Sequence, residues 1–299
     1  MYQDYDISDE KKELFGALLD TLYEIDRVCK KNDIVYYAFA GTLLGAVRHG
    51  GFIPWDDDID LLMLRKDYDK FVEVCNRDID SKYFLQTTLN ENGYYRYPAR
   101  VRKNDTTYLT AQEIKKIKAG KTISYNCGIF ISIFPLDTKP KSDSACKRQK
   151  KMARFRNQIL VSNAYTVDKR FLPLLIKGYC SIVGYKNIYK RLVRSYSKFS
   201  DKRGELVHFP AIYNHAPRTY YYTEDFDKVV TIPFEGFDLP CPVGYKRCLS
   251  IPFGDDYMTP PPFAERGKHH HGEYMNLHTG FKEILSMERS ELIKLIDNV

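Results

Sequence analysis

The sequence predicts a mixed α/β fold, with a small mixed sheet flanked by helices and a basic helical insertion. Two observations favour this class. Apolar residues recur at three- and four-residue steps in the longer segments, which is the period of an amphipathic helix. Between these segments lie short apolar or alternating runs with the length and period of strands. Because the two kinds of segment alternate along the first half of the chain, we expect helices packed on a sheet.

Composition and length place the chain among ordinary globular proteins. It has 299 residues, 43% apolar and 28% charged, which is enough for a full core. The sequence has no apolar run of about 18 residues, and its first residues lack the apolar segment of a secretory signal. Its seven cysteines are scattered and form no C-x-x-C pair. That pattern favours reduced thiols over disulfides or a zinc site, so we expect a cytoplasmic protein.

The first half of the chain alternates between predicted helices and strands. Residues 9–31 are predicted to be a core-packing helix, because Leu14, Leu18 and Leu22 fall on one face. The other expected elements are strands at 34–40, 58–64, 84–87, 99–102, 106–109 and 127–134, and helices at 43–47 and 67–75. Pro135 is expected to end the last of these strands, because proline has no N–H for a strand ladder.

Residues 139–203 are strongly basic. They hold eighteen Lys and Arg against three Asp, so this segment carries about +15 while the whole chain carries +7. The basic residues alternate with long apolar ones at helical spacing, which predicts two or more helices. Two interpretations stay open, a solvated basic face and a surface that contacts an anionic membrane from the cytoplasmic side. We expect no nucleic-acid partner, because the sequence contains no recognised nucleic-acid-binding module.

The most distinctive feature is an acidic cluster between apolar residues. Asp56, Asp57, Asp58 and Asp60 lie within five positions and must repel one another. On a strand, Asp58 and Asp60 point to the same face, where their oxygens suit Mg²⁺ or Mn²⁺. A solvated turn is the alternative. An EF-hand is excluded, because Leu61 stands where its loop needs glycine.

A second feature precedes the acids. Gly41-Thr42 follows an apolar, strand-like run and begins a predicted short helix. Backbone N–H groups at the beginning of a helix suit a phosphate group. A phosphate-binding turn followed by paired carboxylates is the layout of a nucleotidyltransferase-type site.

Three blocks of the sequence resemble the LicD family. The first and most specific is GTLLGAVRHGGFIPWDDDID, residues 41–60. GIFISIFPLD at 128–137 is similar to the family's second block, and FGDDYMTPP at 253–261 with the later His269-His270 to its C-terminal block. The family includes bacterial phosphorylcholine transferases and, more distantly, the fukutin-related ribitol-phosphate transferases. The blocks occur in family order.

The resemblance implies a nucleotidyltransferase fold, a divalent metal and transfer of a substituted phosphate from a CDP-linked donor. CDP-choline is the leading donor, and CDP-ribitol or CDP-glycerol comes next. The implied acceptor is a hydroxyl of a cell-surface glycan, a lipid-linked glycan or a teichoic acid precursor. We expect a catalytic core in residues 1–138, the basic helical insertion in 139–205 and a part completing the active site in 206–299.

The resemblance also implies roles for individual residues. Asp58 and Asp60 would hold Mg²⁺ or Mn²⁺, with Asp56 as a further ligand or, like Asp57, as a supporting group. Backbone groups of Gly41 and Thr42 would bind donor phosphates. The side chains expected to neutralise charge on the donor are Arg48 and His49.

Two further groups have two interpretations each. Arg100 and Arg102 either protect a strand edge from aggregation or clamp the donor's pyrophosphate. His269 and His270 either form a solvated turn or contact donor phosphate.

One residue departs from the family pattern. Ser132 stands where the second block usually carries an Asp that completes the metal site. A hydroxyl is a weaker, neutral ligand and no base near pH 7. Three explanations stay open: natural variation with Asp137 or Asp56 compensating, an engineered inactive variant, and a degenerate enzyme. The alternative function is therefore a non-catalytic relative that binds metal or nucleotide.

Overall fold

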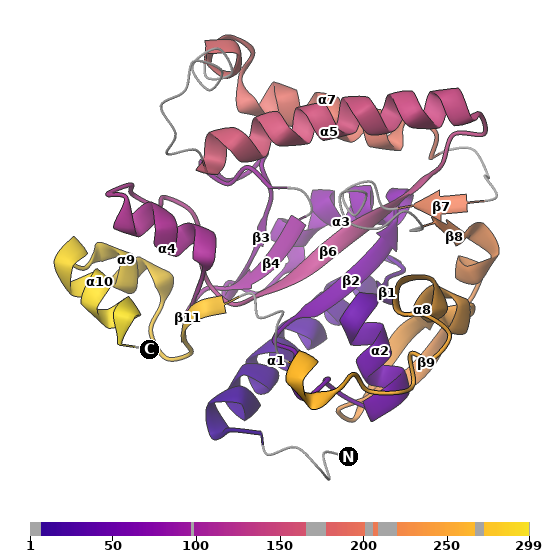
Figure 1. Cartoon of the computed structure of the whole chain (residues 1–299), viewed down its shortest axis with the longest axis horizontal. Helices are drawn as coiled ribbons and strands as arrows, with labels where there is room; N and C mark the ends of the chain where they lie inside the picture. Colours follow the sequence, from indigo (N-terminus) through magenta and orange to yellow (C-terminus); the bar gives the residue numbers. More distant parts are fainter. Residues whose placement is uncertain are drawn as a thin grey trace.

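The computed structural model describes residues 7–96, 99–165, 178–200, 206–208, 220–266 and 272–298. At its centre is a mixed sheet with strand order β3-β4-β6-β2-β1 (Figure 1). β7 pairs with the last residues of β6, and β8 pairs with β7. β2 and β6 run parallel, whereas the other neighbours are antiparallel. The strands are β1 (Tyr37–Ala38), β2 (Ile59–Leu64), β3 (Tyr83–Gln86), β4 (Ala99–Lys103), β6 (Phe130–Thr138), β7 (Leu206–His208) and β8 (Tyr220–Tyr222). The predicted fold class, a small mixed sheet flanked by helices, is confirmed.

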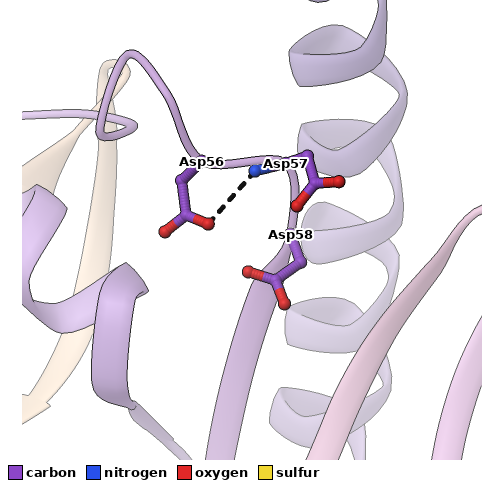
Figure 2. A group of neighbouring side chains, drawn as sticks. All are labelled: Asp56, Asp57 and Asp58. Carbon is purple, nitrogen blue, oxygen red and sulfur yellow. Dashed lines mark hydrogen bonds between the residues drawn. The ribbon is translucent and has the colours of Figure 1, made fainter. Parts of the chain in front are cut away.

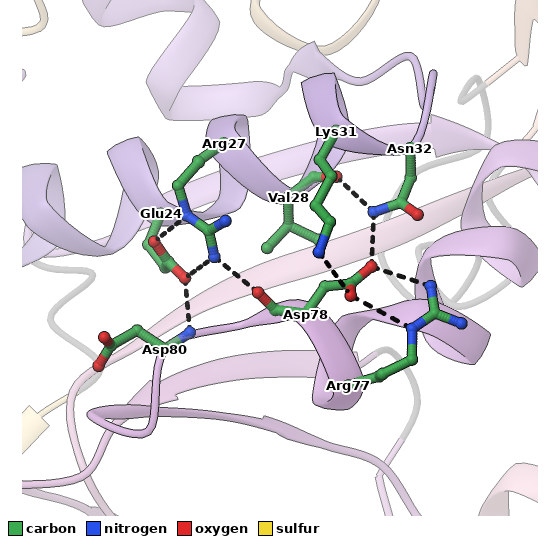
Figure 3. Close-up of polar contacts among 8 residues, drawn as sticks. All are labelled: Glu24, Arg27, Val28, Lys31, Asn32, Arg77, Asp78 and Asp80. Carbon is green, nitrogen blue, oxygen red and sulfur yellow. Dashed lines mark hydrogen bonds and ion pairs between the residues drawn. The ribbon is translucent and has the colours of Figure 1, made fainter.

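Helices α1 (Asp9–Lys31) and α3 (Arg65–Asp78) pack against the central strands. The bounds of α1 agree with the prediction. Ser8 accepts the N–H of Lys11 at its beginning, and acidic residues in the first turn and lysines in the last suit the helix dipole. The ends of α1 and α3 are joined by polar contacts around Asp78, which accepts from Lys31 and Arg77 (Figure 3).

The region before the acidic cluster differs from the prediction. The expected strand 34–40 is reduced to β1, and the expected helix 43–47 is the longer α2 (Ala40–His49). The physical reason is Ala40, whose φ of +46° turns the chain directly from β1 into the helix. Gly41 and Thr42 therefore belong to the first turn of α2.

The prediction that Pro135 ends β6 is wrong, since the strand continues to Thr138. Ile129 points its carbonyl toward β4, where it accepts the N–H of Lys103, and alternation gives Pro135 the same direction. Pairing of β6 with β4 ends at Ile133, and pairing with β7 begins at Asp137. The missing N–H of Pro135 therefore falls in the gap between two partner strands, where it costs no ladder bond.

The basic segment contains helices, as predicted. α5 (Asp143–Tyr165) and α7 (Tyr185–Ser197) lie side by side along the top of Figure 1, and residues 178–183 are also helical. The two long helices are antiparallel, because Gln149 near the beginning of α5 donates to the carbonyl of Ser195 near the end of α7. Ile159, Ile188 and Leu192 form the core between them. Among the described helices, none is long and apolar enough to cross a membrane.

The last part of the chain adds further strands and helices around the main sheet. Its elements are β9 (Val229–Phe234), β10 (Phe237–Pro242), α8 (Tyr245–Phe253), β11 (Gly272–Asn276), α9 (Phe281–Ser286) and α10 (Arg289–Asp297). β9 and β10 form a hairpin that packs beside β1 and α2. β11 pairs with β5 (Thr107–Thr110), next to α4 (Ala111–Lys118). The spacing of apolar residues predicts one amphipathic helix over 283–296, but this segment is divided into α9 and α10, because Met287 and Glu288 are extended.

Candidate active site

Three carboxylates converge in the loop that enters β2. Asp56, Asp57 and Asp58 each offer one oxygen, and these oxygens all lie within 4.8 Å of one another (Figure 2). The loop is held locally, because Asp56 Oδ1 accepts the N–H of Asp57 at 3.1 Å. Tyr108 on β5 donates its hydroxyl to Asp57 Oδ2 at 2.6 Å. The sequence places Asp60 two residues further on, inside β2.

Burial and repulsion between carboxylates disfavour the ionised forms of Asp58 and Asp60. Burial raises the pKa of Asp58 well above its usual value, and repulsion from Asp60, Asp56 and Asp57 raises it further. Burial and Asp56 raise the pKa of Asp60 to about 7, although Arg100 and a hydrogen bond from Ser132 act in the opposite direction. A site that gathers carboxylate oxygens at this electrostatic cost suits a hard divalent cation. The donor set therefore fits Mg²⁺ or Mn²⁺.

The first turn of α2 lies against the cluster. A Cβ on Gly41 would stand 2.5 Å from Asp56 Oδ2, so a larger residue here would displace this carboxylate from its present position. Thr42 Oγ1 accepts the N–H of Asp60 at 2.8 Å and thereby holds β2 against the helix. The N-cap, Phe39, has no side-chain bond to the helix, and first-turn N–H groups have no partner within a helix. This end of α2 can therefore attract an anion.

Asp60, Ser132 and Arg100 form a row across three adjacent strands. Ser132 pairs in register with Asp60 of β2 on one side and with Arg100 of β4 on the other. The guanidinium of Arg100 stacks on Phe130 at 3.6 Å from the ring centre, and burial lowers its pKa to about 10. It forms no hydrogen bond or ion pair with any residue that the structure describes. Arg100 is therefore placed to meet an anion beside the acidic cluster.

Two predicted site residues have other partners. Arg102 is buried and donates to Gln86 Oε1 at 2.8 Å and to the carbonyl of Gly128 at 2.6 Å. Asp137 is fully buried and accepts both Nε and Nη2 of Arg65 at 2.7 Å each, and Ser200 Oγ at 2.8 Å. Five residues also separate Asp137 from Ser132 along β6, which is about 16 Å. We therefore correct both assignments: Arg102 supports the fold, and Asp137 does not compensate for Ser132.

Arg48 and His49 lie at the end of α2 beside Trp55. Arg48 donates to the carbonyl of Tyr257 at 2.9 Å and weakly to His49 Nδ1 at 3.4 Å. Burial lowers the pKa of His49 to about 4, and the charges of Arg48 and Arg266 act in the same direction. The lowered pKa disfavours the charged form of His49, and a role of this residue at donor phosphate stays a prediction. Arg266 lies over Trp55 at 4.8 Å and is a further cation at this place.

A cavity of about 660 Å³ connects these parts. Its lining includes Gly41, Arg48, Trp55 and Asp56 of the first block. It also includes residues of the C-terminal block, which are Phe253, Asp256, Tyr257, residues 259–262 and Glu265. The first and third sequence blocks, almost two hundred residues apart, thus share one cavity of a size that suits a small-molecule ligand.

Several neighbours of the site were absent from the sequence-based prediction. Tyr108 contacts Asp57, whose supporting role was predicted, and Lys11 of α1 interacts electrostatically with Asp56 and Asp57. Trp55 and Arg266 form the cation–π contact described above. Trp55 could have been found from its position beside the acids, whereas the others come from distant segments. The predicted residues His269 and His270 lie outside the described residues.

Comparisons with known proteins agree with this geometry. Residues 33–160 match the family model described as "LicD/FKTN/FKRP, nucleotidyltransferase domain". Lipopolysaccharide cholinephosphotransferase LicD of Haemophilus influenzae is 28% identical over 261 residues, which cover 84% of this chain and 92% of that protein. Shorter matches include an uncharacterized protein of Rickettsia typhi, with 43% identity over 65 residues, 22% of this chain and 20% of that protein. Human ribitol 5-phosphate transferase FKRP is 30% identical over 84 residues, 27% of this chain and 17% of that protein. Residues 33–160 are therefore a domain of the LicD family, and the predicted resemblance to that family is confirmed.

Proposed function

We propose that this protein transfers a substituted phosphate from a CDP-linked donor to a hydroxyl of a glycan, with the help of Mg²⁺ or Mn²⁺. One observation carries the proposal: carboxylate oxygens of Asp56, Asp57 and Asp58 lie within 4.8 Å of one another, and Asp56 also lines the cavity of about 660 Å³. Family membership supports phosphotransfer as the reaction class.

The metal would be held by Asp56 and Asp58, with Asp60 as the next carboxylate along β2. Bound there, it would supply positive charge to the phosphate oxygens of the donor. The chain itself adds Arg100, whose guanidinium has no hydrogen-bond partner among the described residues, and the N-terminal end of α2. Tyr108 and Lys11 fix Asp57, which we assign to supporting the cluster.

The reaction is a displacement at phosphorus. The acceptor oxygen forms a bond to the phosphorus that bears the substituent, and the bond from this phosphorus to the bridging oxygen breaks. Cytidine monophosphate leaves with the electron pair, and a carboxylate of the cluster takes the proton of the acceptor hydroxyl. Such reactions depend mainly on positioning and electrostatic stabilisation, which agrees with a site built from charged groups on rigid strands.

Phosphocholine is the substituent that we favour. The Haemophilus influenzae relative, which matches over most of its length, is named as a lipopolysaccharide cholinephosphotransferase. The cavity also offers aromatic side chains, Trp55, Phe253 and Tyr257, and the acids Asp256 and Glu265, a combination that can bind a quaternary ammonium group. CDP-ribitol and CDP-glycerol are the next candidates, and the shorter match to FKRP supports the first of them.

Ser132 is the reason to consider a second function, which is binding of nucleotide and metal without catalysis. Its hydroxyl donates to Asp60, so the position is occupied by a neutral partner and not by a third carboxylate. A relative that binds nucleotide and metal without turnover would have the same cluster. The two functions differ in one measurable property, which is the release of cytidine monophosphate.

The experiment measures cytidine monophosphate released from CDP-choline, CDP-ribitol and CDP-glycerol at fixed Mg²⁺, with a glycan acceptor. We expect CDP-choline to be consumed fastest. Asp58→Asn should lower the rate at least ~100-fold, because a charged ligand is lost from the site. Asp238→Asn, which changes an exposed carboxylate on β10, should leave the rate unchanged and serves as the control.

A further variant separates enzyme from binding protein. If Ser132 marks a lost catalytic group, Ser132→Asp should raise turnover, since a general base contributes ~10²–10⁴-fold. If the natural site works with serine, the added charge should crowd Asp60 and give no gain. Binding of CDP-choline and Mn²⁺ without turnover in both forms would establish the non-catalytic function instead.

A further inference from the structure

The antiparallel helices α5 and α7 form a basic groove outside the site described above. Its volume is about 320 Å³, and it is lined by one face of each helix. Arg148 of α5 and Arg191 and Arg194 of α7 all contribute to it, and all three are exposed. The described lining contains no carboxylate. A groove with several cations and no acid attracts phosphate groups or other anions.

Exposed apolar side chains lie next to these cations. Met152 lines the same groove, and Phe155 follows it by three residues on the same face of α5 and is 60% exposed. Arg191 donates to the hydroxyl of Tyr179, which is itself exposed. Ile182, three residues further in the helical segment 178–183, is 87% exposed. Large apolar residues this exposed are costly in water unless a partner covers them.

The combination decides between two classes of anionic partner. Duplex nucleic acid offers phosphates, but its surface gives little reward for burying Phe155 and Ile182. A phospholipid surface offers both anionic headgroups and an apolar layer directly beneath them. Charge complementarity and adjacent apolar side chains therefore favour a membrane surface.

We propose that the outer surface of α5, α7 and residues 178–183 binds membranes that contain anionic phospholipid. Arg148, Arg191 and Arg194 contact lipid phosphates, while Met152, Phe155 and Ile182 enter the interface. We call these six residues the docking surface. The proposal is independent of the proposed enzymatic function, because none of the six lines the cavity at the acidic cluster.

The test is flotation of the full chain with vesicles of phosphatidylcholine alone and of phosphatidylcholine mixed with phosphatidylglycerol. We expect binding only to the mixed vesicles. Each basic residue near such a surface contributes about a fivefold change in partitioning, so Arg148→Glu with Arg194→Glu should weaken binding at least ~25-fold. Phe155→Ser with Ile182→Ser should also weaken it, and should make the remaining binding disappear as salt rises.

The matched control reverses two exposed lysines on the C-terminal part, Lys228→Glu with Lys246→Glu, and should change partitioning by no more than about twofold. Equal urea midpoints for all variants establish that they are folded. Three results would overturn the proposal: no flotation of the unmodified protein with mixed vesicles, equal flotation with both vesicle types, or flotation that the docking-surface variants do not reduce. Binding of duplex DNA that these variants abolish, without vesicle binding, would assign the surface to nucleic acid instead.

Discussion

Asp137 and Asp60 are carboxylates in neighbouring strands of one sheet, and their surroundings are opposite. Asp137 has no exposed surface and accepts three hydrogen bonds, two of them from the guanidinium of Arg65. Asp60 faces other carboxylates, and its pKa is raised to about 7 by burial and by Asp56. Burial and Asp56 outweigh the opposing effects of Arg100 and Ser132 on Asp60, so the protein compensates the charge of Asp137 more fully than that of Asp60.

The same difference separates two arginines on β4. Both guanidinium groups stack on Phe130, Arg100 at 3.6 Å and Arg102 at 4.6 Å from the ring centre. Arg102 has Gln86 and Gly128 as partners, whereas Arg100 has no hydrogen-bond partner among the described residues. The hydrogen-bonded charges of Asp137 and Arg102 hold the sheet together, whereas Asp60 and Arg100 lie on either side of Ser132, where Arg100 only partly offsets the effect of burial on Asp60. We interpret the second set as the functional one.

The largest expected effect comes from breaking the compensated pair. Arg65→Met leaves Asp137 buried without its cation, which should lower the free energy of unfolding by ~3–5 kcal/mol. The control is Arg77→Met, which removes one partner of Asp78 at a position where Arg77 is 66% exposed, and should cost less than ~1 kcal/mol. Urea denaturation followed by circular dichroism measures both. Equal losses for the two variants would show that burial of the Arg65–Asp137 pair has no special role.

Glu113 is a second buried carboxylate with compensating partners, and it predicts that the free energy of unfolding depends on pH. Burial alone would raise the pKa of Glu113, but Arg96 and hydrogen bonds from Thr110 and Tyr125 more than offset this and hold it at about 2. Because the folded pKa lies below the unfolded value, this stabilisation is complete above pH ~4.5 and is lost as the pH falls toward ~2.

Glu113→Gln should therefore lower the free energy of unfolding by ~2–3 kcal/mol at pH 6, and the difference from the unmodified protein should shrink below pH ~4.5. Urea denaturation at a series of pH values gives this difference directly. A difference that stays constant down to pH ~2.5 would contradict the assigned cause.

For the acidic cluster of Asp56, Asp57 and Asp58 we expect a mutation to change the free energy of unfolding in the opposite direction. In the presence of a metal chelator at pH 7, Asp58→Asn should raise the free energy of unfolding by ~0.5–2 kcal/mol, because it removes a repelled, buried charge. Asp238→Asn again provides the control, since that carboxylate is exposed. A loss of stability in the Asp58 variant would contradict the assigned repulsion within the cluster.

Local patterns were sufficient to predict most of the fold. The bounds of α1 and the strands β2, β3 and β4 agree with the prediction within about two residues, because periodicity and short-range breakers determine them. The errors arise where a single backbone angle or a strand distant in the sequence determines where an element ends. Ala40 adopts a positive φ that shortens β1, and a gap between β4 and β7 allows β6 to continue through Pro135.

The sequence predicted only those residues of the candidate site that lie close together within one stretch of the chain. Asp56, Asp58 and Gly41 lie within one stretch, and the structure places them together at the cavity or the acidic cluster. Whether a charged residue elsewhere is compensated depends on partners that the sequence does not reveal. Asp137 and Arg102 carry the right chemistry, but Arg65 and Gln86 occupy them.

The most direct test of the proposal that the acidic cluster binds a divalent metal is a calorimetric titration with Mn²⁺. The unmodified protein, Asp58→Asn and Asp238→Asn are titrated in parallel. We predict saturable binding to the unmodified protein and to the Asp238 variant, at least ~10-fold weaker binding to the Asp58 variant, and a free energy of unfolding that rises with Mn²⁺ only where binding occurs. Equal Mn²⁺ affinity in all three proteins, or no binding to any of them, would contradict the assignment of Asp56 and Asp58 as metal ligands.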